Sequence, residues 1–303
     1  MQTILVTGSN GLLGQKLITL FKEHPDWRLV ATSHGPDRYP DNSGYLYEEM
    51  DVRNQSRVRE VLRALKPDAI VHTAAMTNVD ACENDREGCK QLNIEATRYL
   101  TETAGELGAH LIHLSTDFIF DGENGPYREE DTPSPLSYYG QSKLESEQIV
   151  RESATTWTIL RTIIVYGVVH DMSRSNIVLW AKEALEKGQP INVVNDQFRM
   201  PTLAEDLAQA CLLSAEKRAR GIFHISGPDY MSILEIVRRV ARFFHLDETL
   251  IRPISAQTLN QTANRPPKTG FILDKARTEL NYQPHSFEEG LEIVRKQLSS
   301  SRN

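Results

Sequence analysis

The sequence predicts an α/β protein with a Rossmann-type, doubly wound parallel sheet and a smaller C-terminal domain. Two patterns support this prediction. Short apolar stretches alternate with helical patterns through the first half of the chain, and a turn with three glycines follows the first apolar stretch. The second half changes rhythm and is rich in loops after residue 250. With 303 residues, the chain is long enough for one large domain and a companion.

The first half predicts the parallel sheet element by element. Apolar runs indicate strands at 4–6, 28–32, 45–50, 69–71, 111–114 and 158–160, and helical spacing indicates helices at 11–21, 58–65, 93–107 and 144–150. Pro67 ends the second of these helices and Gly108 ends the third. Apolar strands that alternate with helices form a parallel sheet that helices cover on both faces.

The second half predicts helices at 177–185, 203–213, 233–244 and 287–298, with strands at 191–194 and 221–225. We expect residues 1–167 to form the sheet domain and residues 196–227 to return to it. Residues 168–195 and 228–303 are then expected to form the smaller domain, which would bind the substrate.

The composition excludes several classes of function. The formal net charge is −7, and a mildly acidic chain is repelled by a polyphosphate backbone, so we expect no nucleic-acid partner. No apolar run approaches the ~18 residues that a membrane span needs, and the first residues enter a strand at once. We therefore expect no membrane partner and no signal peptide, and a cytoplasmic location follows.

The cysteines and histidines do not predict a metal site. Cys82, Cys89 and Cys211 are odd in number and none forms a C-x-x-C pair, so we expect free thiols. His110 and His113 lie three residues apart in an expected strand, which puts them on opposite faces and argues against a shared metal.

The segment 7–14 predicts a dinucleotide-binding loop, because it follows a strand and opens a helix. Gly8 would make the sharp turn, Gly11 would let the backbone approach a pyrophosphate, and Gly14 would let the helix contact the strand. Asn10 and Leu12 belong to the same expected cofactor site. The phosphates would lie at the helix N-terminus, where free N–H groups and the helix dipole attract anions.

The end of the second strand indicates which coenzyme binds. A carboxylate at this place bonds the ribose hydroxyls of NAD, but this sequence has Ser33 and His34 there and Arg38 soon after. These side chains suit the 2′-phosphate of NADP, so we expect NADP(H) to be preferred, with NAD(H) as the alternative. Arg38 also fits a simpler interpretation as a loop arginine in solvent.

Two further segments fit a cofactor site, although each also fits simple packing. Asp51 and Val52 follow the third expected strand and would face the adenine. Ala74, Ala75 and Met76 follow the fourth, where small residues let a cofactor lie against the backbone.

Tyr139 and Lys143 are the candidates for the chemistry. Their spacing of four puts both side chains on one face of a helix. A phenol has a pKa near ~10, and a neighbouring ammonium is expected to lower it towards the working range of an acid–base catalyst. Thr116 follows a buried strand, at the sheet edge where doubly wound folds bind ligands, and could donate to a carbonyl oxygen.

Taken together, these residues resemble the extended short-chain dehydrogenase/reductase family, and within it the dTDP-4-dehydrorhamnose reductases. The resemblance covers essentially the whole chain. Beyond the glycine loop, it is carried by the segments 74–80 (AAMTNVD), 115–122 (STDFIFDG), 161–162 with 165–167, 196–197 with 201–202, and 265–266 with 273–274.

The resemblance implies reduction of the C4 keto group of a 4-keto-6-deoxy nucleotide sugar, most closely dTDP-4-dehydro-L-rhamnose to dTDP-L-rhamnose. Tyr139 would protonate the new alkoxide, Lys143 would tune Tyr139 and hold the nicotinamide ribose, and Thr116 would bond the carbonyl oxygen. The implied substrate-binding residues are Thr77, Val79 and Asp117, with Arg265 and Lys268 for the diphosphate. Relatives are often dimers, which makes a homodimer the implied assembly.

The sequence departs from these relatives at two places. Related 4,6-dehydratases have Asp-Glu after the active-site Thr, whereas this chain has Asp117 and Phe118, which argues against dehydration. The closest family members commonly have Tyr where Phe118 stands and Trp near Ile164. Both positions belong to the sugar-nucleotide side of the pocket, so the identity of the sugar and of the nucleotide stays open.

Two other functions fit the same family. The regulatory β subunit of methionine adenosyltransferase resembles it and still binds NADP, so a non-catalytic NADP-binding subunit is one alternative. A nucleotide-sugar epimerase is the other, and it would hold NAD tightly and recycle it. The missing carboxylate after the second strand argues against the epimerase.

Overall fold

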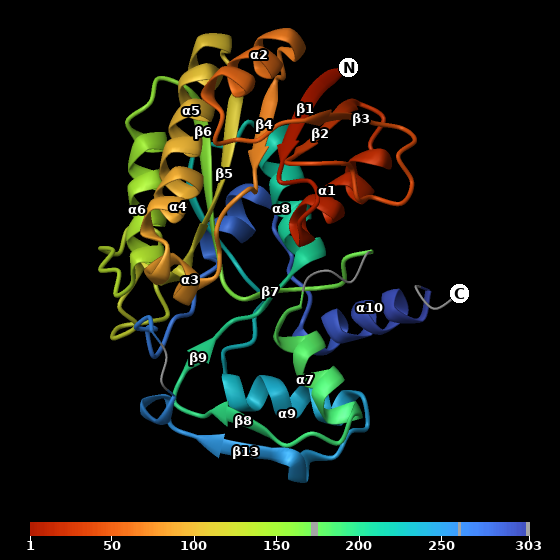
Figure 1. Ribbon diagram of the computed structural model, residues 1–303, viewed down its shortest axis with the longest axis vertical. Helices are drawn as coiled ribbons and strands as arrows, with labels where there is room; N and C mark the ends of the chain where they lie inside the picture. The colour runs from red at the N-terminus through yellow and green to blue at the C-terminus, as the bar shows by residue number, and fades with distance from the viewer. Residues whose placement is uncertain (171–174, 260–261, 301–303) are drawn as a thin grey trace.

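A seven-stranded parallel sheet forms the larger part of the molecule (Figure 1). The computed structural model describes residues 1–170, 175–259 and 262–300. The strand order is β11-β6-β5-β4-β1-β2-β3. Successive strands are therefore added outward from β1 on one side and from β4 on the other, as in a doubly wound fold. The strands are β1 (Gln2–Thr7), β2 (Trp27–Ser33), β3 (Leu46–Glu49), β4 (Ala69–His72), β5 (His110–Thr116), β6 (Thr156–Thr162) and β11 (Gly221–Ile225).

Helices cover both faces of this sheet, and the alternation along β1 shows why. Ile4 and Val6 pack into one apolar cluster with α1 (Leu12–Lys22) and α8 (Ala204–Glu216). Leu5 points the other way, into a cluster with α2 (Gln55–Leu65) and α5 (Ala96–Leu107). All three side chains are buried, so both faces of this interior strand are core. The prediction of a doubly wound Rossmann-type sheet is confirmed.

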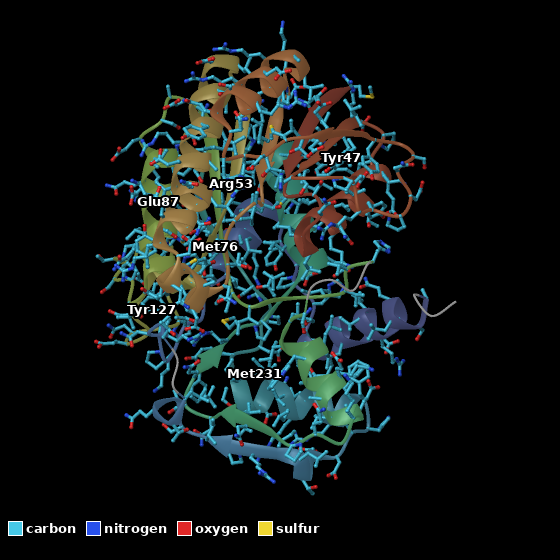
Figure 2. The ribbon with its side chains drawn as sticks, viewed as in Figure 1. Tyr47, Arg53, Met76, Glu87, Tyr127 and Met231 are labelled. Atoms are coloured by element: carbon cyan, nitrogen blue, oxygen red, sulfur yellow. The ribbon has the colours of Figure 1, made fainter. Side chains whose placement is uncertain are left out.

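The smaller part of the molecule lies below the carboxyl ends of the strands in Figure 1. A separate apolar cluster holds it together, with Val178, Val237 and Leu291 at its centre. Its elements are α7 (Ile177–Glu186), β8 (Ile191–Val194), α9 (Ile233–Phe243), β13 (Ile251–Ile254) and α10 (Phe287–Ser300). Strands β8 and β13 pair in parallel, and Met231, labelled in Figure 2, lies in this part. The domain boundaries expected from the sequence stay a prediction.

Several short elements complete the fold. They are β7 (Val165–Tyr166), β9 (Phe198–Arg199), β10 (Thr202–Leu203) and β12 (Met231–Ser232), with 3₁₀ turns at Asp117–Ile119, Glu248–Leu250 and Ala256–Thr258 and a π-helical turn at Ala276–Leu280. β7 pairs with β10 in parallel, and β9 pairs with β12 antiparallel.

The sequence patterns located most elements and missed several ends. The strands expected at 191–194 and 221–225 have those bounds in the structure. The helix expected at 144–150 begins earlier, as α6 (Tyr138–Arg151), because the Ser137 hydroxyl caps it by accepting from Gly140 N–H. The helix expected at 93–107 is present as the end of a π-helical turn, Gln91–Glu95, followed by α5. Helices α3 (Val79–Asn84) and α4 (Arg86–Lys90) were not expected because they are too short to show a period.

The last helix, α10, contacts Tyr166 near its start and the first helix, α1, near its end. Phe287 packs edge-on against Tyr166, with ring centroids 5.3 Å apart, and Gly290 lies against the same Tyr166 ring. At the far end of α10, Gln297 accepts a 3.0 Å hydrogen bond from Lys16 of α1. Among the described residues, none of the helices is long and apolar enough to cross a membrane.

Gly290→Ala is expected to destabilise the protein by about 1–3 kcal/mol, because a Cβ there would meet the buried Tyr166 Oη and lie 2.9 Å from its Cζ. Urea unfolding measures the loss, and Tyr166→Phe should recover part of it by removing the clashing oxygen. Gly105→Ala is the control: its nearest atom would be 4.0 Å away, so this helical glycine should tolerate the change or gain stability. Equal losses in both variants would contradict the packing argument.

Candidate active site

The glycine loop of residues 8–14 has the close contacts that its glycines imply. Gly8 has φ +68°, and a Cβ there would lie 2.8 Å from Ala74 N on the neighbouring strand end. A Cβ on Gly14 would lie 2.5 Å from Ser9 Cα, so the helix can approach the strand only with glycine at this place. Helix α1 then begins at Leu12 without a side-chain cap, which leaves its first-turn N–H groups to an anion. The loop therefore fits a pyrophosphate.

The segment after β2 lies beside this loop. Asn10 fixes it with two hydrogen bonds, from Asn10 Nδ2 to Pro36 O at 2.9 Å and from Arg38 N to Asn10 Oδ1 at 2.9 Å. Ser33 is half-buried, whereas the side chains of His34 and Arg38 are exposed. Both side chains are therefore accessible to a phosphate that arrives from solvent.

Two carboxylates from the neighbouring strand ends reach the same region. Glu49, the last residue of β3, accepts a 3.1 Å hydrogen bond from Gly35 N. The sequence analysis missed it because the expected carboxylate belongs at the end of β2, not of β3. Asp51 is held by Arg53 Nη2 at 2.7 Å, and this hydrogen bonding keeps the pKa of Asp51 below its ordinary value. Val52 is buried beside Asp51. The region after β2 and β3 therefore holds both basic and acidic side chains, which accords with the two coenzymes left open by the sequence.

Residues 74–80 follow β4 at the carboxyl edge of the sheet, where Figure 2 labels Met76. Ala74, Ala75 and Met76 are half-buried, and Asn93 clamps the backbone of Met76 by accepting from its N–H at 2.8 Å and donating to its carbonyl at 3.1 Å. Thr77 is exposed and Val79 is half-buried.

Thr116, Tyr139 and Lys143 come together at this edge, and all three are buried. Thr116 ends β5, and the other two lie one turn apart on α6. Helix α6 approaches the end of β5 so closely that a Cβ on Gly140 would collide with Phe118 O. Glycine between the two candidate residues is therefore what lets the helix bring the Tyr139 phenol to the Thr116 hydroxyl.

Burial controls the electrostatics of Tyr139. It raises the pKa of the phenol; the hydrogen bond with Thr116 lowers it and the nearby Asp117 carboxylate raises it further. The sequence analysis expected Lys143 to lower the pKa of Tyr139, and that expectation is wrong for the free chain. Burial destabilises the phenolate more than the neighbouring groups stabilise it. Tyr139 is consequently protonated at neutral pH, which is the form that donates a proton.

Lys143 is buried as well, and here burial acts in the opposite direction. It lowers the pKa of the ammonium to about 8, partly offset by the negative charge of Glu147 one turn further along α6. Glu147 forms a fully buried pair with Arg161, with Arg161 Nη2 2.8 Å from Glu147 Oε2. The Lys143 Nζ lies 3.4 Å from Nε2 of His113, a neighbour that the sequence analysis did not place in the site.

Asp117, next to Thr116, is the carboxylate that joins the two parts of the molecule. It is fully buried and receives the Thr269 hydroxyl and the Thr116 hydroxyl, the latter at 3.1 Å. Arg199 Nε lies 3.6 Å away and is also buried. The Arg199 guanidinium donates to the carbonyls of Pro266 and Pro267, at 2.7 and 3.2 Å.

Arg199 and Thr269 were missed by the sequence analysis. The segments 196–197 and 201–202, which carry part of the family resemblance, flank Arg199. Nothing in that sequence pattern shows that Arg199 pairs with Asp117.

The two cations expected at the diphosphate differ in their surroundings. Arg265 is tied to α3, where its Nη2 lies 2.6 Å from Asp80 Oδ2. Lys268 is exposed, with its Nζ 5.9 Å from the centre of the Phe198 ring. Lys268 is therefore available to an anion, whereas Arg265 would have to share its guanidinium with Asp80.

The three cysteines are free thiols, as expected. Cys82 and Cys89 pack against Tyr139 in one small cluster, and Cys89 also lies 3.5 Å from the Ser142 hydroxyl. His110 and His113 have separate partners, Thr158 and Ser146. Within 1–170, 175–259 and 262–300, no group of three or more His, Cys, Asp or Glu side chains is arranged to hold a metal ion.

Arg199→Met is expected to cost about 3–5 kcal/mol of stability in urea unfolding, because it leaves Asp117 as a buried carboxylate without its cation. The double variant Asp117→Asn/Arg199→Met should recover much of that loss, since it removes the unpaired charge. Additive losses from the two substitutions would show that the pair is not coupled.

Lys143→Met is expected to stabilise the free chain at pH 7. The pKa of Lys143 is about 8 in the folded protein against an ordinary value of 10.5, so the folded state binds the proton less tightly. The free energy of unfolding of the parent should therefore rise with pH between these values, by about 3 kcal/mol. Urea unfolding across this range checks it, and the advantage of Lys143→Met should be largest below pH 8 and gone above pH 10.5. A constant difference would show that Lys143 titrates normally.

Comparisons with known proteins identify the family of the chain. Residues 1–300 match the model of the RmlD substrate binding domain. Methionine adenosyltransferase 2 subunit beta of Pongo abelii is 34% identical over 280 residues, covering 91% of this chain and 81% of that protein. Spore coat polysaccharide biosynthesis protein SpsK of Bacillus subtilis is 28% identical and covers 99% of both chains.

Among solved structures, a dTDP-4-dehydrorhamnose reductase from Bacillus anthracis, in complex with NADP, superposes with a TM-score of 0.83. It is 27% identical, and the match covers 98% of this chain and 99% of the other. The match of the family model over almost the whole length is decisive, and the chain belongs to the family of the RmlD substrate binding domain.

Proposed function

We propose that this protein is an NAD(P)H-dependent oxidoreductase that reduces the C4 keto group of a 4-keto-6-deoxy nucleotide sugar, with dTDP-4-dehydro-L-rhamnose as the first candidate. The observation that carries the proposal is the buried set of Thr116, Tyr139 and Lys143 at the carboxyl edge of the sheet, beside the glycine loop. The similarity to a reductase solved with NADP supports it.

Thr116, Tyr139 and Lys143 each have one role in this reduction. A bound reduced nicotinamide supplies the hydride. Thr116 holds the carbonyl oxygen through its hydroxyl, and Tyr139 Oη transfers its proton to that oxygen as the alkoxide forms. The raised pKa of Tyr139 keeps this proton in place until the alkoxide, a much stronger base, develops. Lys143 then faces the tyrosinate one helical turn away, and its positive charge stabilises it.

The remaining expected contacts concern the two ends of the ligands. Residues 8–14 would hold the pyrophosphate of the coenzyme, and Ser33, His34 and Arg38 its 2′-phosphate, so we propose NADP(H) as the preferred coenzyme. Thr77, Val79 and Asp117 would line the sugar, and Lys268, with Arg265, would meet the diphosphate. Phe118 and Ile164 replace residues that are common in the rhamnose-forming relatives, which leaves other keto sugars as candidates.

A second function is favoured by the 34% identity to methionine adenosyltransferase 2 subunit beta. In that case the protein would bind NADP and act on a partner enzyme as a regulatory subunit. The two functions differ in one requirement: turnover needs the Tyr139 proton, whereas binding a partner does not.

Tyr139→Phe is expected to lower turnover by a factor of 100 or more, about the contribution of a positioned acid, while coenzyme binding persists. The measurement is oxidation of NADPH and of NADH, followed by absorbance, with dTDP-4-keto-6-deoxy-L-lyxo-hexose generated in situ. Tyr138→Phe is the matched control: the neighbouring tyrosine faces Arg86, whose guanidinium carbon lies 5.0 Å from its ring centre, and should keep near-normal rates.

The other outcomes separate the alternatives. NADPH binding without oxidation, together with a change in methionine adenosyltransferase activity when this protein is added, would support the regulatory subunit. Tightly bound NAD in the purified protein, with interconversion of sugar epimers, would support the epimerase. Equal rates in Tyr139→Phe and the parent would remove Tyr139 as the acid.

A further inference from the structure

His113 is a buried histidine next to Lys143 that the proposed chemistry leaves without a role. It lies on β5, three residues before Thr116, and has no exposed surface. Its Nε2 is 3.4 Å from Lys143 Nζ and 3.0 Å from Ser146 Oγ, and its Nδ1 has no partner within the described ranges. The Lys143 Nζ has no other hydrogen bond within those ranges. The buried ammonium of Lys143 thus lies next to an imidazole.

The hydrogens and lone pairs on the two nitrogens decide whether this contact is a hydrogen bond. An ammonium has three donors and no lone pair, so a close Nε2 is favourable only if Nε2 carries the lone pair. The Ser146 hydroxyl has one hydrogen and two acceptors within reach, the carbonyl of Lys143 at 2.7 Å and Nε2 of His113 at 3.0 Å. A lone pair on Nε2 beside the ammonium requires this hydroxyl to turn its hydrogen towards Nε2, so Ser146 and Lys143 share that lone pair as donors.

We propose that His113 is a positioning residue for Lys143: its neutral imidazole accepts a hydrogen bond from the ammonium through Nε2 and holds the cation under Tyr139. The inference rests on the proposed function for its catalytic meaning, but the hydrogen bond itself can be tested without turnover. Such a bond favours the charged lysine.

The surroundings keep the imidazole neutral. Burial lowers the pKa of His113 well below its ordinary value, and the nearby Lys143 and His72 lower it further. The His72 ring lies 5.5 Å away, but its two nitrogens are taken by Thr7, at 2.8 Å, and Thr97, at 3.3 Å. His72 therefore does not compete for Lys143.

Other titratable and charged groups face Lys143 from every side. They are Glu147 and Tyr139 on α6, Cys89 on α4, Cys82 on α3, His113 on β5 and His72 on β4, with Arg161 of β6 behind Glu147. Glu147 is the one full negative charge in this set and is already paired with Arg161, so the acceptor closest to the ammonium is the imidazole.

The test compares His113→Leu with His110→Leu. His110 lies on the same strand, is equally buried, bonds one hydroxyl, Thr158 Oγ1 at 2.9 Å, and also has a partnerless Nδ1 among the described residues. Each variant is made with and without Lys143→Met, and urea unfolding is followed from pH 6 to 10.5. The pH at which the paired difference begins to fall reports the titration of Lys143 in the folded chain.

We expect this onset to move down by about one pH unit in His113→Leu, the size of a lost hydrogen bond to a charged group, and to stay in place in His110→Leu. His113→Gln, which keeps an acceptor at the same reach, should restore it. An onset that is unmoved in His113→Leu, or moves equally in His110→Leu, overturns the inference.

Ser146→Ala provides a second test that does not touch the imidazole. It removes the other neighbour of Nε2, so the onset should stay or rise, and a fall would overturn the inference. Reductase assays then address the catalytic meaning: loss of turnover should begin at lower pH in His113→Leu than in the parent. If the parent shows no reductase activity but the onset still moves down in His113→Leu, the proposed function is refuted and the hydrogen bond is established.

Discussion

The buried pair of Asp117 and Arg199 is the constraint on which the rest of the site depends. Asp117 follows Thr116 at the end of a sheet strand, and Arg199 belongs to a short strand between the two parts of the molecule. Through the carbonyls of Pro266 and Pro267, Arg199 also anchors the loop that carries Lys268. Two charges removed from water are tolerated only when each has the other and further hydrogen bonds, so this contact fixes the loop that carries Lys268 relative to Thr116.

Burial then determines how the reactive groups behave. The same loss of water raises the pKa of the Tyr139 phenol and lowers that of the Lys143 ammonium. Both groups are thereby driven towards their neutral forms, and the site holds a protonated acid beside an amine that titrates near physiological pH. Helix α6 packs closely against the end of β5, which depends on Gly140, and this packing keeps water away from both groups.

The sequence predicted the features that depend on local spacing. Gly8 and Gly14 identify a turn by their places after a strand, and Tyr139 and Lys143 share a helical face whatever surrounds them. What it could not predict depends on long-range partners: Thr269 meets Asp117 across 152 residues of sequence, and no period or motif encodes such a pairing. The expected lowering of the Tyr139 pKa failed for the same reason, because burial is a property of the assembled fold.

The position of β11 has a consequence for the newly made chain. This strand, Gly221–Ile225, is the outermost of the seven and pairs along β6, from Thr158 to Thr162. Until residue 225 has left the ribosome, β6 therefore presents an open row of backbone donors and acceptors between apolar faces. Such an edge invites pairing with other chains. Shielding this transient edge is a requirement on the growing chain that is separate from the stability of the finished protein.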